Sequence, residues 1–171
     1  MAQPQKFLKV DNNGRVVEES VESVKQTAGA TDANKLIRTG SDGKLDPSLL
    51  PTGVGADALT VIATEDLSAG DFVNIHTGGV RKADASTPGK EADGFVLDAV
   101  LSGQPATVYF EGRNSALTGL TVGERYYLSA VTPGAVTAVA PAAPGTVVQY
   151  LGRASTTTSI AFEATDGIIR A

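Results

Sequence analysis

Turn residues punctuate the second part of the chain at short, regular intervals. From Asp57 onward, groups of Gly, Pro, Asp and Ser interrupt every apolar run after about ten residues, which is the spacing of short strands joined by turns. Pro fixes φ and Gly permits positive φ, so clusters such as residues 87–89, 132–134 and 143–145 favour tight turns. No segment there has the length and periodicity of an amphipathic helix. The pattern predicts an all-β fold in which residues 57–171 form a compact β-sandwich or β-barrel.

The apolar runs between these turns are candidate strands. Apolar and polar residues alternate clearly in two of them: Val108 and Phe110 fall on one strand face, and so do Ile160 and Phe162. The expected strands are residues 59–63, 72–76, 80–83, 94–100, 106–111, 125–129, 135–139, 146–153 and 159–163.

Large apolar side chains are scarce in the first part of the chain. Phe7 is the only aromatic residue before Asp57, although the chain contains 5 Phe and 4 Tyr. Aromatic side chains dominate core burial, and such a segment can hardly offset the roughly 1–2 kcal/mol per residue that ordering the backbone costs. We therefore expect residues 1–56 to form an extended N-terminal arm and linker that folds against another surface.

The arm carries signals for short local elements. Residues 7–10 and 16–17 flank the tight-turn sequence 11–14, which predicts a hairpin. Residues 17–26 place valines near a helical period, so one short helix is an alternative there, although β-branched residues weaken it.

A second short hairpin is expected further along the arm. Residues 35–39 and 44–45 lie on either side of the turn sequence 41–43. Pro47 and Pro51 follow, and residues 53–55 read as a flexible joint.

Composition argues against several classes of partner. The formal net charge is −5 and no block of Lys and Arg is present, so we expect no nucleic-acid partner. No apolar run approaches the roughly 18 residues of a membrane-spanning helix, so no membrane association is expected. Cysteine is absent and the start lacks the pattern of a secretory signal, which fits synthesis in a reducing cytoplasm.

Sequence signals for catalysis are weak, and we expect no enzyme and no catalytic residues. His76 is the only histidine, and no Gly-x-Ser-x-Gly elbow accompanies it, so a strand-end role is the better interpretation. A small hydrolase or lyase remains the disfavoured alternative.

Cofactor and metal patterns are equally weak. Residues 53–58 match Gly-x-Gly-x-x-Ala, but Pro51 precedes them and a β-rich run follows, so we interpret them as a linker and expect no cofactor. With Asp11 counted as the first position of a calcium loop, Gly14 falls at the fourth rather than at the required sixth, which favours a turn. A calcium site built from loop aspartates such as Asp84 and Asp93 is left open as an alternative to the expectation of no metal.

Two stretches resemble proteins of tailed-bacteriophage particles. Residues 32–51, DANKLIRTGSDGKLDPSLLP, resemble connector segments of fibrous and decorating proteins, in which a strand, an Asp-Gly turn, Lys-Leu-Asp and a Leu-Leu-Pro end recur. Residues 119–129, followed by residues 133–134 and 148–154, look like the small β-domains of head-fibre and capsid-decoration (cement) proteins. The resemblance implies a homotrimer attached to the major capsid protein on the outer capsid surface of the virion, with one terminal region bound to the shell.

The arm then supplies the expected partner-binding residues. If it completes a core with copies of itself or with the shell, its large apolar side chains are the anchors. These are Phe7, Leu8, Val10, Leu36, Ile37, Leu45, Leu49 and Leu50.

The main alternative function is a tail-fibre or receptor-binding β-module that recognises a host surface glycan. Such a module needs a concave site lined with aromatic side chains. The tyrosines available for it are Tyr109, Tyr126, Tyr127 and Tyr150, although Tyr126 and Tyr127, as neighbours on a strand, should point to opposite faces.

Overall fold

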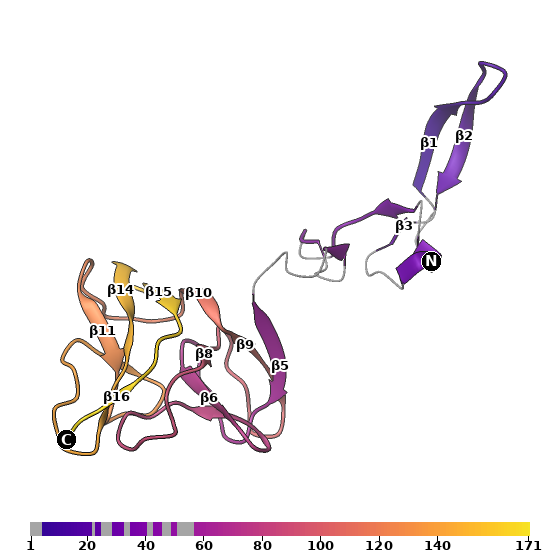
Figure 1. Ribbon diagram of the computed structural model, residues 1–171. Helices are drawn as coiled ribbons and strands as arrows, with labels where there is room; N and C mark the ends of the chain where they lie inside the picture. The colour runs from indigo at the N-terminus through magenta and orange to yellow at the C-terminus, as the bar shows by residue number, and fades with distance from the viewer. Residues whose placement is uncertain are drawn as a thin grey trace. The chain divides into compact units, whose positions relative to one another are not determined.

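The computed structural model is nearly all β and confirms the predicted fold class (Figure 1). It describes residues 5–21, 23–24, 29–32, 35–40, 43–45, 49–50 and 57–171. The chain divides into two compact units, Met1–Gly55 and Ala56–Ala171, which we call the N-terminal and C-terminal units.

The N-terminal unit begins with the predicted hairpin. Strand β1 (Gln5–Val10) pairs antiparallel with β2 (Val16–Val21) in a continuous register from Gln5↔Val21 to Val10↔Val16. Asp11 closes the turn, because its Oδ1 accepts hydrogen bonds from the backbone N–H groups of Asn13 at 2.8 Å and Arg15 at 2.9 Å. At the turn, where the strands no longer pair, this carboxylate satisfies backbone N–H groups that a neighbouring strand would otherwise bond.

The alternative helix over residues 17–26 is wrong wherever the structure describes that segment. Residues 17–21 lie in β2, and Ser23–Val24 form β3. β-branched valines lose side-chain freedom in a helix and fit a pleated surface, so the strand outweighs the helical spacing. Gly29–Asp32 form a 3₁₀ turn (η1), and Leu49 also has 3₁₀ conformation.

The second arm hairpin is also wrong in its pairing. Strand β4 (Leu36–Ile37) pairs in parallel with β3, with Ser23 opposite Leu36 and Val24 opposite Ile37. Gly40 N donates to Lys44 O at 2.7 Å, but the described residues on either side form no ladder with each other, and residues 41–42 of the expected turn lie outside the described residues. Glycine at position 40 weakens a strand there, whereas Val24 supplies a β-branched partner. The joint predicted at residues 53–55 lies outside the described residues.

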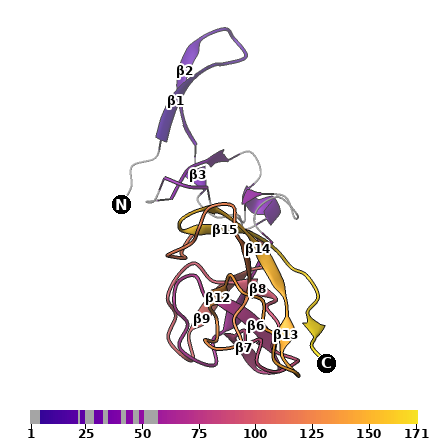
Figure 2. The same cartoon turned by 90° about the vertical axis from the view of Figure 1, so that its left-hand side faces the viewer.

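The C-terminal unit contains two five-stranded antiparallel sheets (Figure 1, Figure 2). The first sheet has the order β5-β9-β8-β6-β7 and the second β10-β15-β14-β11-β12. The first sheet consists of β5 (Ala58–Ile62), β6 (Phe72–His76), β7 (Gly79–Lys82), β8 (Gly94–Phe95) and β9 (Pro105–Tyr109). The second consists of β10 (Glu111–Asn114), β11 (Arg125–Leu128), β12 (Val136–Thr137), β14 (Tyr150–Thr156) and β15 (Ser159–Glu163). A separate short pair joins β13 (Val147–Val148) to β16 (Ile168–Ile169).

The main core lies between the two sheets. Phe72 and Phe95 of the first sheet pack with Leu128, Leu151 and Phe162 of the second, and all five are buried. The Phe72 and Phe162 rings meet edge to face with centroids 5.3 Å apart, a favoured geometry for an aromatic pair. The unit is therefore a β-sandwich, as the sequence predicts.

The first sheet is buried on its other face as well. Val73, the neighbour of Phe72 on β6, packs into a second cluster with Val80, Val96 and Val108. The sheet curls to enclose this cluster, because Ala63, just after β5, forms a parallel bridge with Val80 of β7. The predicted alternatives of sandwich and barrel thus both describe part of the fold.

The predicted strands match the observed ones to different degrees. Residues 72–76 and 159–163 coincide with β6 and β15. The strand expected at 94–100 is wrong beyond Phe95, because Val96 N donates to Asp71 O and Val100 bonds Leu67 instead of continuing the ladder. The expected strand 106–111 is wrong at its end, since β9 ends at Tyr109 and β10 begins at Glu111 in the other sheet.

The expected strand 146–153 is two strands. Val147–Val148 pair with β16, whereas Tyr150–Thr156 belong to the second sheet. Gln149 interrupts the run, and its buried side chain bonds backbone groups on two other segments. The remaining predicted strands are correct within one or two residues, as in 59–63 against Ala58–Ile62.

Candidate functional site

The arm hairpin presents an exposed apolar patch. Leu8 and Val10 lie two residues apart on β1 and so share a face, and Val16 lies directly opposite Val10 on β2. Their side chains are 69%, 65% and 66% exposed. We call Leu8, Val10 and Val16 the hairpin patch. Phe7 lies in β1 opposite Glu19, but its side chain is outside the described residues.

The other predicted anchors are distributed along the rest of the arm. Leu36 and Ile37 form β4 and are both exposed. Leu45 and Leu50 are also exposed, and Leu49 is half-buried. The structure brings Leu8 and Val10 together and Leu36 and Ile37 together, and adds Val16, which the sequence analysis did not assign to the site.

Burial differs sharply between the two units. Every buried hydrophobic residue among those whose burial is described lies between Ala63 and Phe162, inside the C-terminal unit. Within the described part of the N-terminal unit, by contrast, most large apolar side chains are exposed, and Val17, Val24 and Leu49 are half-buried. Exposed apolar surface of this kind is a common mark of a protein contact.

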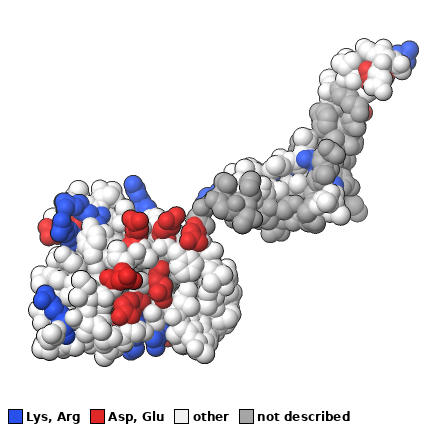
Figure 3. Space-filling view, in the orientation of Figure 1, with Lys and Arg blue, Asp and Glu red and all other residues white. Residues whose placement is uncertain are grey.

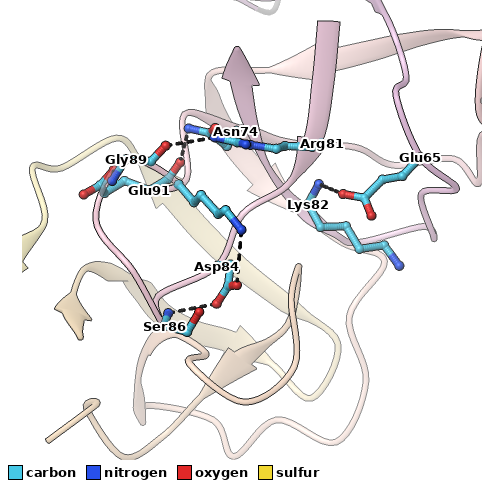
Figure 4. Close-up of polar contacts among 9 residues, drawn as sticks. Glu65, Asn74, Arg81, Lys82, Asp84, Ser86, Gly89 and Glu91 are labelled. Atoms are coloured by element: carbon cyan, nitrogen blue, oxygen red, sulfur yellow. Dashed lines mark hydrogen bonds and ion pairs between the residues drawn. The ribbon is translucent and has the colours of Figure 1, made fainter. Parts of the chain in front are cut away.

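The loop aspartates proposed as an alternative calcium site, Asp84 and Asp93, are engaged within the fold, and Figure 4 shows the contacts of Asp84. Asp84 Oδ1 accepts a hydrogen bond from Ser86 N at 2.8 Å, and its Oδ2 lies 3.9 Å from Lys90 Nζ. Asp93 Oδ2 accepts from Ile75 N at 2.7 Å. No group of metal-binding side chains is found over the described residues.

Nearby polar side chains connect the same loops. Asn74 of β6 donates to Glu91 O at 2.9 Å, and Arg81 of β7 donates to Asn74 Oδ1 at 3.0 Å (Figure 4).

Acidic side chains gather on one face of the C-terminal unit (Figure 3). The residues that line a polar pocket of about 490 Å³ include Glu91, Asp93, Gln149 and Asp166.

His76 occupies the strand-end position expected from the sequence. It is the last residue of β6, and its Nε2 lies 3.1 Å from Thr64 Oγ1.

No helix long and apolar enough to cross a membrane occurs in the parts of the chain that are described.

The four tyrosines separate into two kinds. Tyr109 stacks on Phe95 with ring centroids 5.6 Å apart, and Tyr126 is buried, its hydroxyl accepting from Thr121 N at 2.9 Å. Tyr127 and Tyr150 instead lie on the outer face of the second sheet, with ring centroids 5.9 Å apart. The predicted opposite orientation of Tyr126 and Tyr127 is therefore confirmed.

Comparison with known proteins adds no relative. A scan against models of protein families finds no match, and a search of curated proteins finds no similar sequence.

Proposed function

We propose that this chain is a structural virion protein that binds the outer surface of a phage capsid as a homotrimer and cements neighbouring capsomers. The observation that supports this proposal is the exposure of large apolar side chains along the arm, next to a C-terminal unit with a complete core of its own. The resemblance of residues 32–51 and 119–154 to decoration proteins supplies the partner, the major capsid protein.

The arm provides the binding energy in this proposal. Burying a side chain such as Leu8 stabilises a contact by about 1.5–3 kcal/mol when its exposed surface is covered. Short strands such as β4 can also add to a neighbour's sheet, with alternate side chains filling pockets. Three arms in one trimer bind at once, so linkage raises the effective affinity.

Cementing follows from where the arm binds. An arm that contacts two capsomers loses its binding energy when they separate, so it opposes expansion under internal genome pressure. Stabilisation by mass action of this kind depends on the concentration of free protein.

The test is co-sedimentation of the full chain with capsids that lack it. Leu8, Val10 and Val16 are replaced together by Ser, and a control variant carries the same change at Val122, Val131 and Val139, which are 60%, 91% and 78% exposed on the C-terminal unit. We expect the hairpin-patch variant to lose particle binding and the control to keep it.

Deletion of residues 1–51 should leave a folded C-terminal unit that no longer co-sediments. Binding retained by both arm variants would place the contact elsewhere and overturn the proposal.

A further inference from the structure

The outer face of the second sheet carries a row of arginines. Antiparallel pairing sets Arg125 of β11 directly opposite Arg153 of β14, Arg153 opposite Ala161 of β15, and Ala161 opposite Arg113 of β10. All four side chains point outward, because their strand neighbours Tyr126, Ala154, Ile160 and Asn114 are buried. We call Arg113, Arg125 and Arg153 the arginine row.

The charge of this row is not compensated within the described structure. None of the three arginines forms an ion pair with a carboxylate in the described ranges. Like charges directly opposite each other on neighbouring strands are destabilising. Arg153 is nevertheless held in place, since its Nη1 donates to Gly123 O at 2.8 Å. Arg153 is thus oriented before any ligand arrives, with no carboxylate partner of its own in the described ranges.

A depression lies beside the row. It has a volume of about 310 Å³, and Tyr150, Gly152, Arg153, Ala161 and Glu163 are among the residues that line it. Gly152 has no side chain and Ala161 only a methyl group, so neither fills the space between the longer side chains. Small residues between long ones leave room for a ring-sized ligand.

One wall of the depression is an oriented aromatic ring. Tyr150 is 37% exposed, and Tyr127 on the next strand packs against it at an interplanar angle of 65°. The Tyr150 backbone is also tied, because Thr165 Oγ1 donates to its carbonyl at 2.8 Å. An exposed tyrosine held in this way offers a flat apolar face at little entropic cost.

The next row of the same sheet face is acidic. Glu111 lies directly opposite Glu163, two residues along β15 from Ala161, a separation of about 7 Å. By the same register Tyr150, opposite Tyr127, shares this row with Glu163, so a ligand in the depression meets Arg153 at one end and Glu163 and the Tyr150 ring at the other. Arginine pairs with a carboxylate, and glutamate accepts hydrogen bonds from hydroxyl groups.

We propose that this depression binds an acidic saccharide, with a sugar ring against Tyr150, its carboxylate on Arg153 and its hydroxyl groups on Glu163. A neutral sugar leaves the arginine row unpaired, and a simple anion makes no use of the ring or of Glu163. The site lies on the C-terminal unit and does not depend on the arm, so it goes beyond the proposed attachment to a capsid.

The experiment is a titration of the full chain at low salt with tri-galacturonic acid, followed by NMR or calorimetry, with neutral tri-galactose as the matched ligand. We expect saturable binding of the acidic sugar, weaker binding of the neutral one, and loss of affinity as salt is raised. Arg153→Gln should weaken binding by about tenfold, since it removes a charge-assisted hydrogen bond. Arg170→Gln, outside the depression, is the control and should bind as the unchanged chain does.

A second pair of variants separates binding from folding. Tyr150→Phe keeps the ring and should retain affinity, whereas Tyr150→Ala should lose about tenfold. No saturable binding of either sugar would overturn the proposal, as would equal affinity for both sugars or binding unaffected by Arg153→Gln. Self-association of the chain that Arg153→Gln abolishes, without sugar binding, would show that this face binds a second copy and would overturn it as well.

Discussion

Gln149 bonds both polar groups of the Ala92 backbone: its Oε1 accepts from Ala92 N at 2.7 Å, and its Nε2 donates to Ala92 O at 2.9 Å. The same Nε2 also donates to Thr165 O at 2.8 Å. One buried amide thereby joins the loop before β8, the start of β14 and the segment after β15. Buried backbone groups of this kind need a partner, and here a single side chain supplies three bonds.

We expect Gln149→Ala to lower the free energy of unfolding by about 3 kcal/mol, because it removes the partner of the buried N–H and C=O of Ala92 and of the part-buried C=O of Thr165. Urea denaturation of the full chain followed by circular dichroism measures this. Gln104→Ala is the matched control, since Gln104 is exposed, and should stay within about 0.5 kcal/mol of the unchanged protein. Equal stability of the two variants would show that water replaces the lost bonds.

A second prediction concerns the closure of the first sheet. Gly79 has φ of 149°, and a Cβ there would lie 2.2 Å from Ile62 O, whereas Gly78 has φ of 103° with nothing within 4 Å. Gly78→Ala should cost about 1–2 kcal/mol from backbone strain alone. Gly79→Ala should cost clearly more, because it also separates β7 from the end of β5. Thermal unfolding of both variants checks the difference, and identical midpoints would argue against tight closure.

A third prediction concerns the core between the sheets. Phe162 contacts Phe72 and Phe95 of the opposite sheet, with ring centroids at 5.3 Å and 5.9 Å. Phe162→Ala should destabilise the C-terminal unit by about 3–5 kcal/mol, whereas exposed Val139→Ala should have little effect. Chemical denaturation distinguishes them, and a loss below about 1 kcal/mol would mean that the sheets are not held by this cluster.

A fourth prediction separates folding from association in the arm. Replacing exposed Leu36 and Ile37 by Ser should leave the stability of the C-terminal unit unchanged within about 0.5 kcal/mol. If the arms associate in a trimer as proposed, sedimentation velocity should show the variant shifted toward monomer. A variant that melts earlier yet keeps its mass would contradict a role in association.

The sequence located some strands closely because local signals coincide there. β15 is bounded by Thr-rich and acidic residues, and buried Ile160 and Phe162 alternate with exposed Ala161 and Glu163, so period and boundaries agree. β10 was missed, since Gly112, Arg113 and Asn114 have little strand propensity and only the pairing with β15 defines it. β16 was missed for a similar reason: it is two residues long and exists through its pairing with β13.

The candidate sites likewise divide into residues that local sequence signals identify and arrangements that only the pairing of strands creates. Leu8, Val10, Leu36 and Ile37 could be chosen from hydrophobicity alone, because few such residues occur in the arm. The parallel pairing of β3 with β4 and the arginine row depend on register between segments far apart in sequence, which local patterns do not specify. The outer-face tyrosines were named, but their separation from Tyr109 required knowing which rings the two sheets enclose.

Phe110 is the one residue between β9 of the first sheet and β10 of the second, and its N–H donates to Asp57 O at 2.9 Å. Because the connection is a single residue, it restricts how far the end of β9 and the start of β10 can move apart. Asp57 directly precedes β5, an edge strand of the first sheet, so this bond ties the entry of the chain into the C-terminal unit to the residue at which the chain passes to the second sheet.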